Sequence, residues 1–538
     1  MNIKILDCTL RDGAYITNAK FGEASIRGII SQMQKAHAEV IECGWLKDSP
    51  YETGSTFFHI PSDVEGYIQE KSKDILYCAM IDWDRYKVES LPPYDGKSID
   101  AIRVVFPHGR HREGISVGEK IRERGYKVLF QAANTLSYSD DDLRDLAEDM
   151  NKFMPVSVSI VDTFGAMYFE DLDRIATVLD KYLDKKINLG FHAHNNQQLA
   201  FALCIDFIKG MKDKRNIIVD ATLSGMGRGA GNATTELVAN YLNRFQHGNY
   251  DMNAIMDAID IYMQKYKEQY TWGYSTPYFI AGMYQCHVNN IAYLLTNHRT
   301  SAKDMRTIIA ALSVEERRKY DYDLLEEKYL ENQGRHVDDE EDIEKLTNEF
   351  KNRTVLLLAP GKSIVIHKEK IEKYIKKNKP VVIAVNAINR DHEFDYVFFT
   401  NRARYDYAKE AYPTIFTNAN KILLSNIRTE GNEKEIILNY NYVVKRGWRH
   451  FDNAVILCLR LMYKLNVSDV IIAGFDGFKT KYNESYADSS LPTLNPDNKW
   501  DELNDEIKEI YEDLYWSVAD HMRIAFLTES IFEIRERK

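Results

Sequence analysis

The stretch IKILDCTLRDGAY, residues 3–15, shows the pattern that decides the fold of the first half of the chain. A short β-rich apolar run leads into polar residues and then into Gly13, which permits a sharp turn. Seven similar runs follow before residue 240, separated by helical patterns. They are VIECGW (40–45), ILYCAMI (75–81), IRVVF (102–106), KVLFQA (127–132), VSVSIVD (156–162), INLGFHAH (187–194) and IIVDATL (217–223).

The spacing of these eight runs favours a closed parallel barrel. Their starts recur roughly every 30 residues, which leaves room for one strand, one crossover helix and two loops. We therefore expect an α/β fold with an N-terminal (β/α)8 TIM barrel over residues 1–250. An open doubly wound sheet is the alternative. Polar residues at the ends of the runs, where barrel active sites lie, favour the barrel.

The remainder of the chain divides by pattern into three parts. Residues 251–333 read as helix with little β signature, so we expect a helical extension of the barrel. The acidic segment 334–351 is typical of a linker. Residues 352–538 alternate again and predict a Rossmann-like α/β domain. Its expected strands are TVLLLAP, PVVIAVN, YVFFTN, TIFTN, KILLSN, NYVV, DVIIAGFDG and IAFLTES.

Composition limits the class of protein. Of the 538 residues 44% are hydrophobic and 28% charged, which is typical of two or three globular domains. The 70 Lys and Arg against 81 Asp and Glu give a net charge of −11, so we expect no nucleic-acid partner. The six cysteines form no CxxC pair, which indicates a reducing cytoplasm. The N-terminus reads as a strand rather than a signal peptide, and we expect no membrane insertion.

Three side chains in the first and seventh runs have the chemistry of metal ligands. Asp12 ends the first run, and His192 and His194 share one face of the seventh because side chains alternate along a strand. One carboxylate and two neutral imidazoles suit a divalent metal ion with open positions for substrate. We expect Mn²⁺ first, with Mg²⁺, Co²⁺ and Zn²⁺ as alternatives. An HxH pair by itself more often has a structural role than a metal-binding role.

The eighth run continues into a glycine-rich turn, GMGRGAGN (225–232), which ends in Asn232. Such a turn brings backbone close to a ligand. A tight loop and a phosphate nest at the next helix are the alternatives. The spacing does not fit GxGxxG after a first strand, which disfavours a dinucleotide site.

These motifs, in this order, resemble the metal-dependent aldolase and lyase superfamily that includes 4-hydroxy-2-oxovalerate aldolases, HMG-CoA lyase and isopropylmalate synthase. The resemblance spans roughly residues 3–295 and rests on TLRDG, IECGW, VDTFGA, HAHNN and DATLSGMGRGAGNA. The last motif is most similar to the 4-hydroxy-2-oxo acid aldolases. The stretch WGYSTPYFIAGMY (272–284) resembles their helical extension.

The resemblance implies roles for individual residues. Asp12, His192 and His194 match the metal ligands, with Asn232 as a further ligand or a support for the others. Arg11 matches the arginine that stabilises the enolate oxygen. Tyr284 lies where aldolases place a tyrosine that orients the substrate hydroxyl, although an ordinary core aromatic is the alternative.

One position departs from the family pattern. The aldolases continue the first motif to a histidine thought to act as base, whereas this chain has Tyr15. Tyrosine, with a reference pKa of about 10, is a poor base at neutral pH. His108 and His111 after the fourth run, or a metal-bound hydroxide, are the candidate replacements. Both histidines are also typical of a surface loop.

Two acidic residues, at the ends of the second and sixth runs, are expected to support the site. We expect Glu42 to orient Arg11 or a ligand, with a structural salt bridge as the alternative, and Asp162 to act similarly. Gln131 and Asn134, at and beyond the end of the fifth run, are weaker candidates for facing the substrate.

The C-terminal half offers one candidate anion site. In LLLAPGKSI (356–364), the residues Gly361, Lys362 and Ser363 have the chemistry of a phosphate cradle, although Leu356 occupies the first Walker glycine position. The stretch from 447 to 478 faintly resembles a bacterial sialyltransferase-like Rossmann domain. A nucleotide sugar is the partner that this resemblance implies.

The sequence thus predicts a carbon–carbon lyase of the 4-hydroxy-2-oxo acid aldolase type. It would act on a 2-oxo acid and an aldehyde through a pyruvate enolate, in surface-glycan or sugar-acid metabolism. A Claisen-type acyl-CoA synthase is one alternative. The other is a nucleotide-sugar-binding or glycosyltransferase-like protein with a degenerate barrel. The helical extension suggests a homodimer.

Overall fold

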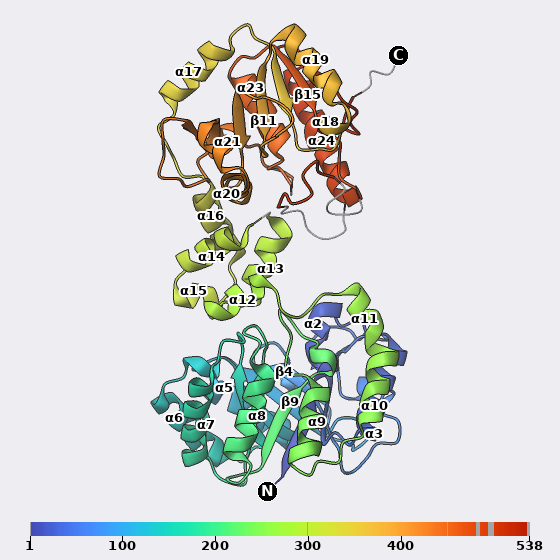
Figure 1. Cartoon of the computed structure of the whole chain (residues 1–538). Coiled ribbons are helices and arrows are strands. Elements are labelled where there is room, and N and C mark those ends of the chain that lie inside the picture. Colours follow the sequence, from blue (N-terminus) through green and yellow to red (C-terminus); the bar gives the residue numbers. More distant parts are fainter. Residues whose placement is uncertain (1, 299, 449, 480–484, 493–499, 535–538) are drawn as a thin grey trace. The chain divides into compact units, whose positions relative to one another are not determined.

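The computed structural model describes residues 2–298, 300–448, 450–479, 485–492 and 500–534 (Figure 1). Its internal contacts divide the chain into two compact units. The first comprises Met1–Val288 with Arg317–Lys319, and the second comprises Asn289–Glu316 with Tyr320–Lys538.

The first unit is an eight-stranded parallel barrel, which confirms the expected fold. Each strand pairs with its neighbours in parallel, and pairing of the first two strands through Leu6 and Val40 closes the sheet. All eight predicted runs form these strands. They are β1 (Ile3–Asp7), β2 (Val40–Leu46), β4 (Leu76–Asp82), β5 (Ala101–Phe106), β6 (Lys127–Ala132), β7 (Ser157–Asp162), β8 (Asn188–Ala193) and β9 (Ile217–Ala221), with the two-residue β3 (Phe57–Phe58) added beside β2.

Alternation along the strands divides the apolar residues between two layers. One set packs outward against the helices, as Ile102 and Val104 do. A separate small cluster, which includes Leu6, Cys78 and Leu129, fills the interior of the barrel. The polar side chains inside the barrel therefore gather toward the carboxyl ends of the strands, above this apolar layer.

Helices surround the barrel (Figure 1). The long ones are α3 (Glu23–Lys35), α5 (His111–Glu123), α6 (Asp140–Phe153), α7 (Phe169–Tyr182), α8 (Ala200–Met211) and α9 (Thr235–Phe245). Two crossovers contain only α4 (Ser62–Glu65) and η1 (Val88–Ser90), where we expected full helices. Pro92 and Pro93 lie in the second of these crossovers, and proline is not tolerated inside a helix.

The predicted helical extension is divided between the two units. Helices α10 (Met252–Asp257), η4 (Ala258–Met263), α11 (Gln264–Gln269) and α12 (Thr276–Met283) belong to the first. Most of α13 (Val288–Asn297), together with α14 (Ala302–Ala311) and α16 (Tyr322–Gln333), belongs to the second, while α15 (Val314–Arg318) straddles the division. The expected linker 334–351 contains α17 (Glu340–Phe350), whose Leu346 and Phe350 are fully buried. It is therefore a packed element of the second unit.

The second unit contains an open, all-parallel sheet of seven strands in the order β14-β13-β12-β11-β10-β15-β16. The strands are β10 (Val355–Leu358), β11 (Val381–Val385), β12 (Tyr396–Phe399), β13 (Asn420–Leu424), β14 (Glu435–Leu438), β15 (Asp469–Ala473) and β16 (Arg523–Phe526). Its helices are α18 (Ser363–Ile366), α19 (Lys368–Asn378), α20 (Arg402–Ala411), α21 (Pro413–Asn418), α22 (Tyr440–Val443), α23 (Ala454–Lys464) and α24 (Trp500–Val518). The direction of winding reverses between β10 and β15.

Two predicted strands of this unit are helices. TIFTN lies in α21, where Pro413 occupies the first turn and is preorganised for a helix start. NYVV lies largely in α22. The strand β14 was not predicted, because its four residues follow a charged segment and carry only a short apolar pattern.

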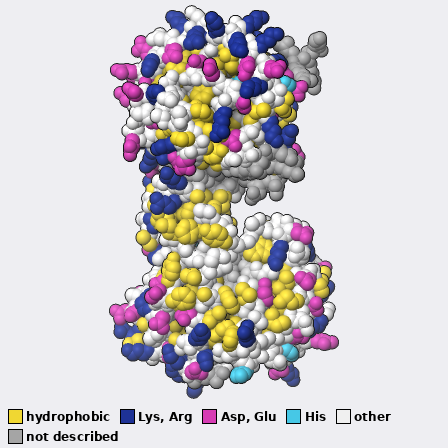
Figure 2. All heavy atoms as spheres, viewed as in Figure 1, with side chains coloured by type: hydrophobic (Ala, Val, Ile, Leu, Met, Phe, Trp, Pro, Cys, Tyr) yellow, Lys and Arg dark blue, Asp and Glu magenta, His cyan; other side chains and the backbone are white. Residues whose placement is uncertain are grey.

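The visible surface carries charges of both signs. Figure 2 shows Lys and Arg interspersed with Asp and Glu over each unit on that face. Among the described residues, no helix combines the length and the apolar character needed to cross a membrane.

Candidate metal centre at the mouth of the barrel

The first part of the site is a single helical turn, α1 (Thr9–Asp12), directly after β1. Leu223 anchors this turn to the end of β9 by donating its backbone N–H to Thr9 Oγ1 at 2.8 Å. Gly13 follows with an ordinary helical φ of −64°, so it does not make the sharp turn that we expected. A Cβ atom at Gly13 would lie 2.7 Å from Phe21 and Met226, so glycine is needed there for space.

The second part is the end of β8 and the glycine-rich turn after β9. Ala193 packs into the outer core, while His192 and His194 both line the interior pocket. His194 forms a one-residue antiparallel bridge with Asn232. Gly231 allows the turn to close, because its φ is +83° and a Cβ atom would lie 2.0 Å from a backbone oxygen. This turn places Asn232 beside the two histidines.

Hydrogen bonds fix the orientation of both imidazoles. His192 Nδ1 lies 3.1 Å from Asp220 Oδ2, and His194 Nδ1 lies 2.8 Å from the carbonyl oxygen of Asp162. Each Nδ1–H therefore has an acceptor, which leaves the Nε2 lone pair for another partner. His192 Nε2 lies 3.4 Å from Asp12 Oδ2.

Burial sets the protonation of these groups. It lowers the pKa of both His192 and His194, so the rings stay neutral. Burial alone would raise the pKa of Asp12, but the adjacent Arg11 and the two histidines outweigh it, and the pKa is lowered. An ionised carboxylate beside neutral imidazoles is the state in which these residues bind metal ions.

Asn232 provides an independent indication that a cation fits. Its Nδ2 donates to Asp12 Oδ2 and to the carbonyl of Met226, both at 3.0 Å. Its Oδ1 is buried and accepts no hydrogen bond from any described residue. Buried oxygens normally have a partner, and an amide oxygen is a suitable ligand for a hard divalent ion. The donor set therefore fits a divalent metal ion.

Cys8 also lies beside the candidate ligands. The ligand atoms of Cys8, Asp12 and His192 lie within 4.8 Å of one another, whereas His194 is outside this tight group. Burial raises the pKa of the Cys8 thiol well above its usual range. Its Sγ lies 3.4 Å from the carbonyl of Ala221 and 3.6 Å from Asp12 Oδ2, as expected of a weak donor. Cys8 therefore supports Asp12 as a neutral thiol.

A chain of buried charges connects the site across the barrel. Arg11 pairs with Asp12 and donates from Nε to Glu42 Oε2 at 2.7 Å. Arg103 lies 3.0 Å from the same Glu42 oxygen and donates to Asp220 Oδ2 at 2.5 Å. Asp220 in turn holds His192. Glu42 thus contacts both Arg11 and Arg103 inside the barrel.

Sequence reasoning missed Arg103 and Asp220. Both are at most 1% exposed and lie in apolar strand runs, IRVVF and IIVDATL. A charged residue is almost never fully buried unless it is paired. Charges inside apolar barrel strands were therefore the signal that could have identified them.

These residues open into a pocket of about 820 Å³ at the carboxyl ends of the strands. Tyr15 lines it, and the guanidinium of Arg228 lies 3.6 Å from its ring centroid. Tyr15 is 38% exposed, but partial desolvation at the pocket wall raises its pKa to about 12, so the phenol stays protonated and is not a base. His287, which the sequence did not single out, also lines the pocket. Burial, reinforced by Arg228, lowers its pKa to about 3.

Two expected catalytic residues do not line this pocket. Helix α12 ends before Tyr284. The guanidinium carbon of Arg317 lies 5.0 Å from the centroid of the Tyr284 ring. The chain then turns at Gln285, which has a φ of 49°, and His287 reaches the pocket instead. His108 stays in a surface loop, where its Nε2 lies 3.2 Å from Asp142.

The remaining candidates have other partners. His111 Nε2 lies 3.2 Å from Asp149. The carboxylate of Asp162 accepts backbone N–H groups of Ala166 and Met167, and burial raises its pKa to about 7. Gln131 lines the pocket and donates to Asp220 at 3.1 Å, whereas Asn134 does not line it.

The expected phosphate cradle of the second unit already holds an anionic group. Ser363 donates its backbone N–H to Asp476 Oδ2 at 2.8 Å, and its hydroxyl bonds the other oxygen of that carboxylate. Lys362 is exposed. Asp476 thus takes the place that we expected a phosphate to occupy beside Gly361, Lys362 and Ser363.

Fold and site together define a TIM barrel with a buried carboxylate and imidazole centre at the carboxyl ends of its strands. The profile of the family described as HMGL-like matches residues 112–261, which include His192, His194 and Asn232. The barrel is similar to this HMGL-like family over these residues, which confirms the resemblance in its motifs.

Individual relatives are distant. An oxaloacetate decarboxylase of Mycobacterium tuberculosis is 26% identical over 260 residues, which are 47% of this chain and 74% of that protein. A 4-hydroxy-2-oxovalerate aldolase of Thermomicrobium roseum is 28% identical over 265 residues, 48% of this chain and 71% of that protein. A crystal structure of the N-terminal domain of a candidate aldolase from Bacteroides vulgatus is 27% identical with a TM-score of 0.49, covering 57% of this chain and all of that one.

Proposed function

We propose that the barrel is a divalent-metal-dependent carbon–carbon lyase of the 4-hydroxy-2-oxo acid aldolase type. The observation that carries this proposal is that Asp12 and the two oriented imidazoles line one pocket with Arg11. Asn232, which donates to Asp12 from Nδ2, keeps a buried oxygen without a partner among the described residues. Relatives named oxaloacetate decarboxylase and 4-hydroxy-2-oxovalerate aldolase support a lyase of 2-oxo acids.

The residues that would hold the metal ion are Asp12, His192 and His194, with Asn232 beside them. We propose Mn²⁺ first. When bound, the ion supplies a Lewis acid that polarises the 2-oxo group of the substrate. Asp220 and the Asp162 carbonyl keep the two imidazoles in the required tautomer, because each accepts the Nδ1–H of one ring.

Arg11 is suited to stabilise the enolate. Glu42 and Asp12 hold its Nε and Nη1, and its Nη2 donates to no described residue. This remaining donor lines the pocket and can meet the oxygen on which negative charge develops as the C3–C4 bond breaks. A charge-assisted hydrogen bond at that oxygen is worth most in the transition state.

The residues that can exchange hydrogen bonds or protons with the substrate are Tyr15 and His287, which line the pocket. As the bond breaks, the 4-hydroxyl loses its proton, the fragment leaves as an aldehyde, and the enolate takes a proton at C3 to give pyruvate. Tyr15 remains a phenol and can only donate to a substrate oxygen. His287 is a neutral imidazole in this pocket that can accept a hydrogen bond from the 4-hydroxyl, but with a pKa of about 3 it does not retain the proton.

A mass-resolved screen tests the reaction. Pyruvate is incubated with a panel of aldehydes, with Mn²⁺ and with a chelator. We expect an adduct of pyruvate and one aldehyde that disappears with the chelator. Adducts that persist without metal would contradict the proposal, and thiol release from acetyl-CoA in place of an adduct would identify a Claisen-type synthase.

We also propose a setting for the enzyme. A sugar-derived aldehyde as the preferred substrate would support surface-glycan or sugar-acid metabolism in the cytoplasm, and a simple aliphatic aldehyde would contradict it. The proposed homodimer is tested by the mass of the protein in solution. The nucleotide sugar expected at the C-terminal half takes no part in the barrel reaction.

A further inference from the structure

The second unit has its own pocket, of about 780 Å³, at the carboxyl edge of its open sheet. The loops after β10, β11, β12 and β15 line it, together with the start of α23. In open α/β sheets, ligands bind outside the carboxyl ends of the strands where the winding reverses. Here the winding reverses between β10 and β15.

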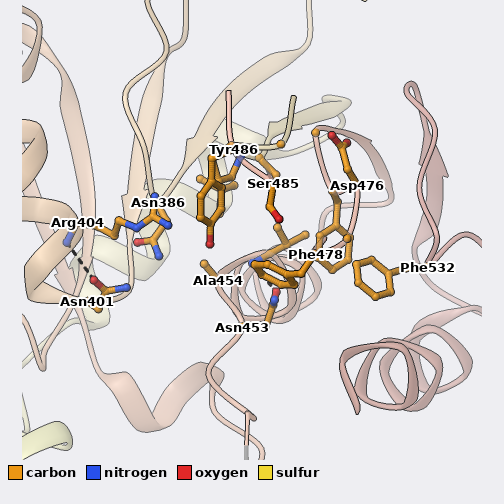
Figure 3. Close-up of a pocket in the computed structure, with 18 of the residues that line it drawn as sticks. Asn386, Asn401, Arg404, Asn453, Ala454, Asp476, Phe478, Ser485, Tyr486 and Phe532 are labelled. Atoms are coloured by element: carbon orange, nitrogen blue, oxygen red, sulfur yellow. Dashed lines mark hydrogen bonds between the residues drawn. The ribbon is translucent and has the colours of Figure 1, made fainter. Parts of the chain in front are cut away.

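Two buried amides in this pocket have their oxygens committed to backbone. Asn386 is 9% exposed, and its Oδ1 accepts the N–H of Thr400 at 3.0 Å. Asn453 is 7% exposed, and its Oδ1 caps α23 by accepting the N–H of Val455 at 3.1 Å. Both side chains border the same cavity (Figure 3). Because each Oδ1 already accepts a hydrogen bond from the backbone, the Nδ2 group of each amide is the one that remains available as a donor.

Neither Nδ2 group donates to any residue that the structure describes. Both Nδ2 atoms are open to the cavity rather than sealed inside the protein, so each can donate a hydrogen bond to a group that occupies the cavity. Asn386 also adopts a φ of 57°, in the left-handed region that few side chains occupy. The two amides indicate a ligand rich in hydrogen-bond acceptors.

One cationic side chain, Arg404, borders the pocket beside Asn386, and two carboxylates, Asp452 and Asp476, border it as well. Arg404 is 6% exposed and lies over the ring of Tyr486 at 4.7 Å. The N-termini of α20 and α23, helices of 10 and 11 residues, also border the pocket through their caps Asn401 and Asn453. Helix N-termini favour negative charge. The acceptor-rich part of the ligand is therefore anionic.

The other side of the pocket is aromatic. Figure 3 shows Phe478 and Phe532 away from Asn386 and Arg404, across the cavity. Phe532 packs on Phe475 with ring centroids 4.5 Å apart, and Phe478 stacks on Trp500 at 5.9 Å. Rings held in this way offer a rigid apolar surface to a flat group, and stacking on one aromatic ring is worth about 1 to 3 kcal/mol per base.

We propose that this pocket binds a nucleotide, free or as the nucleotide part of a nucleotide sugar. The base would lie against the aromatic side, and the phosphate would meet the amides of Asn386 and Asn453 and the guanidinium of Arg404. The phosphate therefore binds across the cavity from the Gly361 loop, where Asp476 already occupies the anion position. This proposal concerns the second unit and does not depend on the barrel reaction.

Isothermal titration calorimetry of the full chain tests the proposal. The ligands are the four common nucleoside monophosphates, CMP- and UDP-linked sugars, the matching nucleosides, and inorganic phosphate alone. For one of the bases, we expect the nucleotide to bind at least about tenfold more tightly than the matching nucleoside. The same nucleotide should also bind at least about tenfold more tightly than inorganic phosphate alone. Tighter binding of the nucleotide sugar would identify that source. No binding of any nucleotide at about 1 mM, where binding is worth only about 4 kcal/mol, would overturn the proposal.

Isosteric variants locate the ligand. Asn386→Asp and Asn453→Asp keep the oxygen that accepts backbone N–H and replace the free donor by a second, negative oxygen. Each should weaken nucleotide binding about tenfold or more. Asn432→Asp is the matched control, because Asn432 is exposed and its Oδ1 likewise accepts a backbone N–H, that of Lys434, at 3.0 Å. It should bind as the unaltered protein does.

Unchanged binding in both pocket variants would overturn the proposed location. Thermal unfolding of all three variants separates a loss of binding from a loss of fold, since the retained hydrogen bonds from backbone N–H groups should keep their midpoints close together. Metal-dependent enolisation of pyruvate, measured on the same preparations, should not change. Failure of the nucleotide proposal is thereby distinguished from failure of the barrel proposal.

Discussion

Replacing Arg103 by methionine should lower the stability of the barrel more than any comparable surface change. The Arg103 side chain is 1% exposed and lies between Glu42 at 3.0 Å and Asp220 at 2.5 Å. Methionine fills part of the same space but leaves two buried carboxylates without their shared partner. Breaking a buried ion pair in this way costs about 3 to 5 kcal/mol.

Scanning calorimetry measures this loss. For a unit of this size, each kcal/mol lowers the midpoint by about 2 to 4 °C, so we expect a decrease of roughly 10 °C. Arg112→Met is the matched control. Arg112 also pairs with two carboxylates, Asp145 at 2.6 Å and Asp149 at 2.8 Å, but its side chain is 64% exposed. Exposed pairs are worth about 0 to 1 kcal/mol, so its midpoint should change by a few degrees at most.

Equal midpoints for the two variants would refute the reasoning, because burial is the main difference between the two arginines. A second readout connects this network to function. Asp220 orients His192 through Nδ1 at 3.1 Å, and loss of such a support lowers metal affinity about 10- to 100-fold. Titration of Mn²⁺ followed by electron paramagnetic resonance should show that loss in Arg103→Met and not in Arg112→Met.

Three further predictions follow from single side chains. Burial raises the pKa of Asp7 from 3.8 to about 6, so the folded state binds the proton more tightly and stability falls as pH rises through that window. Asp7→Asn should therefore gain up to about 3 kcal/mol above pH 6 and little below pH 4 in thermal unfolding, and an equal gain at both ends would contradict the sign. Tyr15→Phe should lose less than about tenfold in kcat, because a phenol with a pKa of about 12 is no base, and a thousandfold loss would give Tyr15 a proton-transfer role. Tyr284→Phe should leave kcat and KM within about twofold, because Tyr284 lies under Arg317 outside the pocket, and a large rise in KM would restore its expected role.

The barrel was predictable because its signals are local. Each strand run is short, apolar and bounded by polar residues, and all eight runs are strands. The ligand candidates were equally accessible, since an alternating HxH at a strand end places both rings on one face. The absence of a full helix between β4 and β5 could also have been predicted, because Pro92 and Pro93 are not tolerated inside a helix.

What could not be predicted depends on contacts between distant residues. Arg103 and Asp220 meet across the barrel although 117 positions separate them. His287, rather than Tyr284, enters the pocket because of a turn at Gln285 that no motif announces. The loop at Ser363 matches a phosphate cradle in composition, yet Asp476, 113 positions away, fills it. In each case the sequence shows a residue with suitable chemistry, but a contact with a distant part of the chain decides what that residue does.

Exchange of the pyruvate methyl hydrogens for deuterium, followed by NMR in D₂O, tests the central claim most directly. The claim is that Asp12, His192 and His194 hold a divalent ion that, with Arg11, stabilises a pyruvate enolate. The unaltered protein should catalyse the exchange with Mn²⁺ and lose it with a chelator. His108→Ala, which removes a surface histidine paired with Asp142, should keep the exchange, and His194→Ala should abolish it. Full exchange in His194→Ala, or exchange that the chelator leaves intact, would contradict the claim.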